Sequence, residues 1–212
     1  MSENIRPRLY LITPRALPAS DGLSALSDAL TGGDVASVLI TAPDGEQSDD
    51  YIDDAVRIVQ RAGVAAVVLN DTNAVEAYHG DGVHIDTGID ELKQAVRQFQ
   101  PNRIVGAGGV SDRHDAMGFG EAGADYVFFG RLDLPEQPEP HRKTLQFTKW
   151  WAPMFEIPSV AMAGTDLVGI TDLVTLGADF IAVRDAIWTH DTGPAAAVAQ
   201  ANTLIDAAME LV

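Results

Sequence analysis

Cysteine is absent from the 212-residue chain, which excludes disulfides, thiolate chemistry and zinc sites built from thiolates. A chain without cysteine fits a reducing compartment, and we expect a cytoplasmic location. No apolar run approaches the ~20 residues that a membrane-spanning helix needs. The opening segment MSENIRPRLY has no positively charged region leading into a long apolar stretch. We therefore expect neither a signal peptide nor a membrane partner.

Basic residues are also scarce: 14 Lys and Arg stand against 31 Asp and Glu, giving a formal net charge of -17. Binding to nucleic acid or to an anionic membrane needs a basic face, so we expect neither partner. A phosphorylated ligand would have to be held by local groups: a metal ion, backbone N–H groups at helix starts, or a few placed Arg and Lys. The charge also fits plain solubility.

Short β-branched runs alternate with amphipathic segments along the whole chain. Strands are predicted at 8–13, 36–40, 64–69, 82–85, 103–107, 125–130, 157–163 and 179–183. Helices are predicted near 21–31, 48–63, 71–79, 88–99, 111–123, 142–155, 166–177 and 191–210. Uninterrupted alternation predicts parallel strands, either in a doubly wound open sheet or in a closed barrel. Eight units in 212 residues without a midpoint break favour one (β/α)8 TIM-barrel domain over residues 1–212.

Repeated local signals mark where the predicted helices end and begin. RAGVAAVVL, EAGADYVFFG and TLGADFIAV each read as a helix end, a glycine and then a strand. Gly63, Gly123 and Gly177 are therefore predicted left-handed caps. Residues suited to N-caps begin three predicted helices: Ser48, Ser111 and Asp166.

Polar residues follow two neighbouring predicted strands, at the rim where TIM barrels place their active sites. Asn70 and Asp71 end the third strand, and Asp86 ends the fourth. Such hard oxygen ligands suit Mg²⁺ shared with a substrate phosphate. The alternative, equally open from the local sequence, is that Asp71 and Asp86 only cap the helices that follow.

Glycines and arginines at the same rim indicate anion binding. Gly108 and Gly109 follow the fifth strand and allow close backbone approach, and Arg113 lies just beyond them. Gly164 follows the seventh strand, in the region where barrels often bind phosphate. Arg184 ends the eighth strand, where it could bind an anion or form an internal ion pair.

Three further features have less specific interpretations. His84 lies inside the fourth predicted strand, and a packed, hydrogen-bonded histidine is favoured over a ligand or base. The Pro- and charge-rich segment 131–143 is predicted to be a long mobile loop. Trp150 and Trp151 are expected in the core or at an interface, which makes a homo-oligomer plausible.

The ordered set of motifs resembles the thiamine-phosphate synthase family and its thiazole tautomerase relatives, over nearly the whole chain. The resemblance rests on RLYLIT, LND, DGVHI, IVGAGGVSDRHDA, GADYVFFG, PSVAMAG, GADFIAV and AIW, in that order. It implies a compact barrel that joins a pyrimidine pyrophosphate to a thiazole phosphate in thiamine biosynthesis, releases pyrophosphate and depends on Mg²⁺. Both substrates would be small phosphorylated molecules.

The resemblance also implies roles for particular residues. Asn70 and Asp71 match the Asn-Asp pair that contacts the pyrimidine pyrophosphate and its Mg²⁺. The family's second metal carboxylate falls on Ile89, where the flanking Asp86 and Asp90 are the candidate replacements.

Gly164 matches one of the two glycines that bind the thiazole phosphate, but other positions depart from the family pattern. SVLITAPDGEQ lacks the Arg and Lys that grip pyrophosphate after the second strand. A family loop with a lysine is replaced by residues 131–143, where Arg131, Arg142 and Lys143 are unaligned substitutes. The remaining replacements are Ala163 for glycine, Gly108 for serine and Asp185 for serine.

Three functions are compatible with these residues. The favoured hypothesis is a working synthase, a transferase. The alternative is a catalytically inactive barrel that binds a pyrimidine or thiazole phosphate as a regulatory or carrier protein, as the missing cations would predict. The weakest hypothesis is an isomerase like the tautomerases, because Val110 stands where they carry a histidine.

Overall fold

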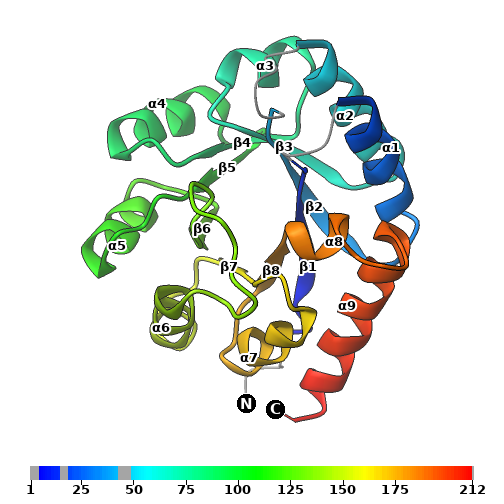
Figure 1. Cartoon of the computed structure of the whole chain (residues 1–212). Coiled ribbons are helices and arrows are strands. Elements are labelled where there is room, and N and C mark those ends of the chain that lie inside the picture. Colours follow the sequence, from blue (N-terminus) through cyan, green and yellow to red (C-terminus); the bar gives the residue numbers. More distant parts are fainter. Residues whose placement is uncertain (1–4, 15–18, 43–48, 212) are drawn as a thin grey trace.

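The computed structural model describes residues 5–14, 19–42 and 49–211, and within them eight parallel strands close into a barrel (Figure 1). The strands are β1 (Arg8–Ile12), β2 (Val35–Ile40), β3 (Ala65–Leu69), β4 (Gly82–Ile85), β5 (Ile104–Ala107), β6 (Tyr126–Phe129), β7 (Ser159–Met162) and β8 (Phe180–Val183). Each strand pairs with its neighbour in sequence, and β8 closes on β1. The predicted TIM barrel is confirmed.

Helices surround the strands, one after most of them (Figure 1). They are α1 (Ala19–Ala29), α2 (Asp49–Arg61), α3 (Thr72–Ala77), α4 (Ile89–Phe99), α5 (Arg113–Glu121), α6 (Arg142–Trp151), the 3₁₀ turn η1 (Leu167–Gly169), α7 (Ile170–Thr175), α8 (Asp185–Trp188) and α9 (Pro194–Met209). In the part of the chain that the structure describes, no helix is long and apolar enough to cross a membrane.

One predicted helix is divided in the structure, and one observed helix lies outside the predicted ranges. The segment predicted at 166–177 begins as η1 and continues as α7. The last predicted helix is preceded by α8, and α9 begins only at Pro194, whose ring fits the first turn of a helix but not its interior.

One predicted N-cap is wrong and one is confirmed. Asp112, not Ser111, caps α5, because its carboxylate accepts the backbone N–H groups of His114 and Asp115. Asp166 caps η1 as predicted, by accepting the N–H of Val168. Ser48 lies outside the described residues.

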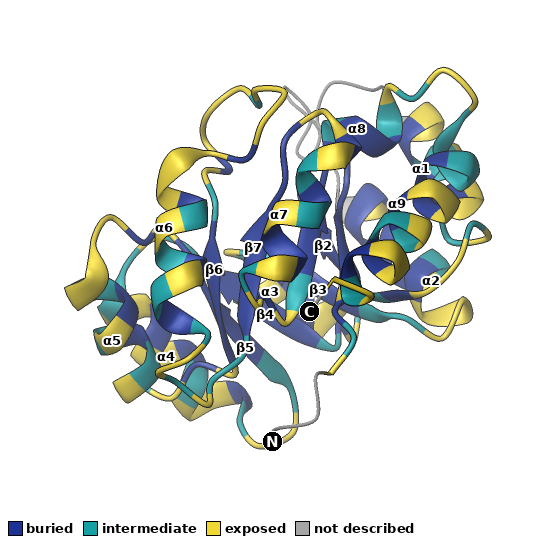
Figure 2. Ribbon diagram, turned by 90° about the horizontal axis from the view of Figure 1, so that it is seen from below, coloured by how far each residue is buried: buried dark blue, intermediate teal, exposed yellow. Residues whose placement is uncertain are grey.

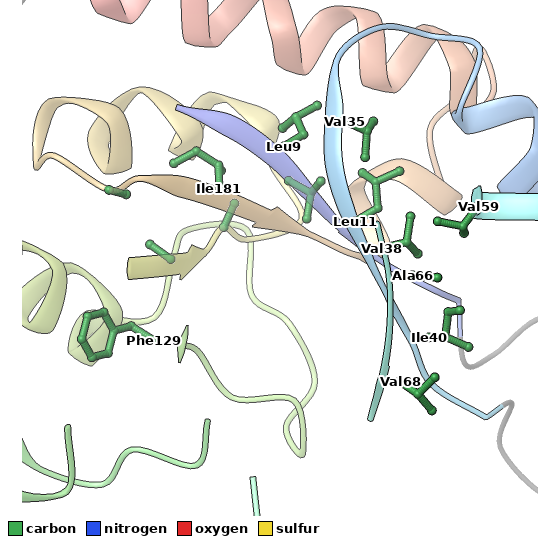
Figure 3. Close-up of a cluster of buried hydrophobic side chains, with 14 of the residues drawn as sticks. Leu9, Leu11, Val35, Val38, Ile40, Val59, Ala66, Val68, Phe129 and Ile181 are labelled. Carbon is green, nitrogen blue, oxygen red and sulfur yellow. The ribbon is translucent and has the colours of Figure 1, made fainter. Parts of the chain in front are cut away.

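Alternate residues of each strand build two apolar layers. Outward residues such as Leu9, Leu11 and Val38 pack against the helices, as Figure 3 shows for several strands. Inward residues such as Tyr126 and Phe128 fill the barrel. Figure 2 shows the strands as a buried layer between helices whose outer faces are exposed. This two-layer burial is typical of a packed TIM barrel, in which the functional residues lie at the end of the barrel and not in its interior.

The amino-terminal rim is tied together by a repeated hydrogen bond. Asp81, Asp125 and Asp179 each stand just before a strand and accept a backbone N–H from the preceding strand, at 2.7–2.8 Å. The glycines Gly63, Gly123 and Gly177 have φ of +73°, +96° and +85°, so the predicted left-handed caps are confirmed. Two of the internal repeats, EAGADYVFFG and TLGADFIAV, therefore supply aspartates that stabilise the rim opposite the predicted site.

Candidate active site

The carboxyl ends of β3 and β4 are joined by a reciprocal hydrogen bond between two predicted site residues. Asn70 Nδ2 donates to Asp86 Oδ1 at 2.5 Å, and the Asp86 N–H donates to Asn70 Oδ1 at 3.0 Å. Asn70 is held in the left-handed region with φ of 54°, a conformation that asparagine tolerates better than most residues. Asn70 and Asp86 are therefore brought together, and Asp86 is orientated by its neighbour.

Asp71 and Asp86 differ in their relation to the following helices. Asp71 caps α3 by accepting the Ala74 N–H at 2.8 Å, which is the capping role expected as the alternative. Asp86 does not cap α4, whose N-cap is Gly88. Asp90 lies exposed in the first turn of α4, and it does not line the cavity that Asp86 lines.

A cavity at this rim has a volume of about 460 Å³ and lies between the ends of β4, β5 and β6 and the start of α6. This volume suits a small-molecule ligand. Its lining residues are Asp86, Gly109, Val110, Ser111, Phe128, Gly130, Arg131, Leu132, Asp133, His141, Lys143, Thr144 and Phe147. The cavity therefore combines two carboxylates, two cationic side chains and two phenylalanine rings.

The cations of this cavity come from the segment that replaces the expected family loop. Lys143 lies in the first turn of α6, and its Nζ donates to the Ser111 carbonyl at 3.0 Å. Arg131 makes a two-point ion pair with Asp133 at 2.7 and 2.8 Å. The Ser111 carbonyl uses one of the three N–H donors of the Lys143 ammonium group, so the other two can bind an anion.

Gly109 and Gly108 have separate roles at the end of β5. Gly109, with φ of +72°, lines the cavity and packs so closely on Asp86 that a Cβ there would meet the Asp86 carbonyl oxygen at 2.6 Å. Gly108 instead lies over His84: a Cβ at this position would be 2.4 Å from His84 Nε2. Gly109 therefore belongs to the open site, whereas Gly108 makes room for a buried histidine.

His84 ends a chain of hydrogen bonds inside the barrel. Its Nδ1 lies 2.9 Å from the Tyr126 hydroxyl, which lies 2.7 Å from the Tyr10 hydroxyl. All three side chains are buried. Burial lowers the pKa of His84 from 6.5 to about 3, because no nearby charge offsets the loss of water around an imidazolium. The interpretation of His84 as a packed, hydrogen-bonded residue is confirmed.

Arg113 lies away from the cavity. Its guanidinium stacks on the ring of Trp150 in α6, with Cζ 4.8 Å from the ring centroid. The neighbouring Trp151 is fully buried in the outer core. The structure therefore joins Arg113 to the α5–α6 surface and not to the other predicted anion-binding residues.

Arg184 and Gly164 lie together at the β7–β8 side of the rim, but the chain itself covers both. Arg184 pairs with Glu136 at 2.6 Å, so the internal ion pair is the arrangement observed. The predicted mobile loop packs over Gly164: a Cβ there would meet the carbonyl oxygens of Gln137 and Pro138 at 2.4 and 2.2 Å. These two residues are thus near each other, yet separate from the open cavity.

The oxygen donors at this rim suit a magnesium ion only if a bound substrate supplies further ligands. Among the described residues, no group of three or more His, Cys, Asp or Glu could hold a metal ion. Mg²⁺ is commonly held by one or two carboxylates together with substrate phosphates and water. Asp86, orientated by Asn70, and Asp71 at the end of the adjacent strand are the carboxylates that would hold the ion, and one oxygen of Asp71 already accepts the Ala74 N–H.

Comparison with known proteins identifies the family of this barrel. The family model described as thiamine monophosphate synthase matches residues 9–187. The chain belongs to this family. A thiamine-phosphate synthase of Rhodospirillum centenum is 39% identical over 205 residues, covering 93% of this chain and 97% of that protein. One of Hyphomonas neptunium is 37% identical over 210 residues, covering 95% of each chain.

A solved structure agrees with the family in its fold. The thiamine phosphate pyrophosphorylase of Pyrococcus furiosus superimposes with a TM-score of 0.78 at 21% identity, covering 96% of this chain and 98% of that one. The suspected thiamine monophosphate synthase family is therefore confirmed, together with its association with thiamine biosynthesis.

Sequence reasoning missed several residues of the cavity in this thiamine monophosphate synthase relative. Phe128, His141 and Thr144 line the cavity, and none of them is among the candidate site residues from the sequence. The signal available for His141 was its position directly before α6, where its ring nitrogen caps the helix by accepting the Lys143 N–H. A histidine followed by two basic residues at a helix start could have indicated that cationic side chains line the cavity.

Proposed function

We propose that this chain is a working thiamine-phosphate synthase, a transferase that joins hydroxymethylpyrimidine pyrophosphate to thiazole phosphate and releases pyrophosphate. The observation that carries the proposal is the cavity of about 460 Å³, where Asp86 and the cations Lys143 and Arg131 line one space. The family membership supports the substrate class, and the cavity supplies charges of both signs for it.

The reaction breaks the C–O bond between the pyrimidine methylene group and pyrophosphate, and it forms a C–N bond to the thiazole nitrogen. Negative charge accumulates on the departing pyrophosphate. In this chain Lys143 and Arg131 would stabilise that charge, in place of the basic residues absent after β2. Arg131 would have to exchange Asp133 for the ligand, whereas Lys143 need only turn from a backbone carbonyl.

Binding residues follow from the same geometry. Asn70 orientates Asp86, and Gly109, which lines the cavity, lets the turn after β5 pack against the Asp86 backbone. Asp71 and Asp86 would hold Mg²⁺, which when bound neutralises charge on the pyrophosphate. Asp90 would join them only after a shift of the β4–α4 connection. The phosphate-binding role, the metal dependence, the cytoplasmic location and a homo-oligomeric state all stay predictions.

A second function, binding without turnover, is favoured by a different observation. Arg184 and Gly164 are both covered by the chain, and no basic residue follows β2. A barrel that retains its pocket but has given up the reaction would have these features. Product formation separates the two functions.

The proposal is tested by replacing the lysine of the cavity. Lys143→Met is compared with Lys149→Met, which removes the same charge from a residue of α6 that does not line the cavity. Loss of one placed donor commonly costs ~10²–10³ in rate, and we expect kcat of thiamine phosphate formation to fall by about that factor only in Lys143→Met. Equal rates in both variants would contradict the role of Lys143. Absence of product in the wild-type chain would contradict the synthase.

A further inference from the structure

The segment that crosses the β7–β8 side of the rim makes a set of hydrogen bonds that all run in one direction. This segment, residues 131–141, is called the lid below, and it connects β6 to α6. In the bonds between the lid and the ends of β7 and β8, the lid supplies acceptor oxygens and the rim supplies donors. A phosphate group is likewise an acceptor of several hydrogen bonds, so it could replace these oxygens.

Arg184 provides the charged donors. Its guanidinium donates to the carbonyl oxygens of Leu132 and Leu134 at 3.0 and 3.1 Å, and to Glu136 Oε1 at 2.6 Å. The side chains of Arg184 and Glu136 are only 6% and 4% exposed, so water does not compete for this pair. A guanidinium with its donors converging on one buried carboxylate and two carbonyls is an anion-binding arrangement that the lid has filled.

Backbone N–H groups provide the other donors. The Thr165 and Asp166 N–H groups donate to the carbonyl oxygens of Gln137 and Pro138 at 2.9 and 3.0 Å. The Asp185 N–H donates to Glu136 Oε1 at 3.2 Å. In TIM barrels the turns after the seventh and eighth strands are where phosphate groups are often bound. In this chain the N–H groups of these turns are hydrogen-bonded to oxygens of the lid.

Two features indicate that the lid is held less firmly than a permanent part of the core. Glu136 Oε2 is buried and has no hydrogen-bond partner among the described residues, and a buried carboxylate oxygen without a partner costs free energy. Burial, and then the charge of Asp185, raises the pKa of Glu136 accordingly. A cavity of about 240 Å³ is also lined by lid residues together with Met162 and Gly164 of the rim, so the packing between lid and rim is incomplete.

We propose that the lid is autoinhibitory: Glu136 and the carbonyl groups of Gln137 and Pro138 occupy donors that would otherwise hold a phosphate, and the lid leaves Arg184 when an anion binds there. The lid therefore competes with a phosphorylated ligand inside the same molecule. The apparent affinity for phosphate is reduced by the fraction of molecules in which the lid is closed. This inference does not depend on the proposed reaction, because it concerns binding alone.

The test is calorimetric titration of inorganic phosphate into the wild-type chain, Glu136→Gln and Glu139→Gln. Glu139 is an exposed residue of the same lid, so both variants change the net charge equally, but only Glu136→Gln alters the contacts to Arg184 and to the Asp185 N–H. We expect Glu136→Gln to bind phosphate about tenfold more tightly than the other two proteins. Replacing Arg184 by Met in the Glu136→Gln background should abolish that gain.

Equal affinities in the three proteins, or no binding in any of them, would overturn the proposal. So would a gain that survives the loss of Arg184, because the phosphate would then bind elsewhere. If Glu136→Gln does not fold, limited proteolysis of the wild-type chain decides: saturating phosphate should speed cleavage within residues 131–141 and leave the rest of the barrel intact. Unchanged cleavage in the lid would refute the proposal. If the lid proposal is refuted, the proposed formation of thiamine phosphate is unaffected, so each proposal can fail without the other.

Discussion

The buried histidine His84 predicts a specific loss of stability in acid. In the folded chain its pKa is lowered to about 3 by burial, whereas the unfolded imidazole titrates near 6.5. Between these values the unfolded state binds more protons than the folded state, so stability is present above pH 6.5 and is lost as the pH falls. The linkage relation gives a loss of about 2 kcal/mol between pH 7 and pH 5 from this residue alone.

The assay is urea unfolding at pH 7 and pH 5, comparing the wild-type chain with His84→Gln. The amide retains a hydrogen-bonding group for Tyr126 but cannot take up a proton in this range. Both proteins share their carboxylates, so the difference between their pH dependences isolates His84. We expect the wild type to lose about 2 kcal/mol more than the variant over this interval.

A matched control is His79→Asn, because His79 is exposed and its φ of 57° suits asparagine. This variant should keep the pH dependence of the wild type. Parallel loss of stability in the wild type and His84→Gln would refute the reasoning, since it would mean that burial does not keep His84 neutral.

Two further predictions separate the two rims of the barrel. Asn70→Gly keeps the left-handed backbone but removes both hydrogen bonds to Asp86, and we expect kcat/KM for thiamine phosphate formation to fall by about 10²-fold or more; an unchanged value would show that Asp86 needs no orientation. Asp125→Ala leaves the Val105 N–H without its 2.7 Å acceptor, and urea unfolding should report a loss of about 1–3 kcal/mol. Its kcat should stay that of the wild type, and a lower kcat would contradict a purely structural role.

The barrel could be predicted from the sequence because its signals are local. Runs such as ASVLI and VAAVVL are β-branched and short, and the glycines before the strands mark helix ends within a few residues. The pairing of Asn70 with Asp86 followed from the fold, since adjacent parallel strands bring their carboxyl ends to one rim. Local patterns that agree with the global fold are the ones from which structure can be read.

The closed lid and the cationic side chains of the cavity, Arg131 and Lys143, could not be predicted, because their positions depend on contacts between distant segments. Arg184 and Glu136 are 48 residues apart, and Lys143 reaches Ser111 across 32 residues. The composition of segment 131–143, rich in proline and charge, indicates a loop but not what the loop covers. The internal ion pair and the anion site were equally compatible with an arginine at a strand end, and only the position of Glu136 decides between them.

The measurement that tests the central claim most directly is product formation by the unmodified chain. Purified protein is incubated with hydroxymethylpyrimidine pyrophosphate, thiazole phosphate and Mg²⁺, and both thiamine phosphate and pyrophosphate are quantified. The proposed reaction predicts equal amounts of the two products, formed only when metal and both substrates are present. Binding of either substrate without any thiamine phosphate would contradict a working synthase and leave a barrel that retains the pocket without the reaction.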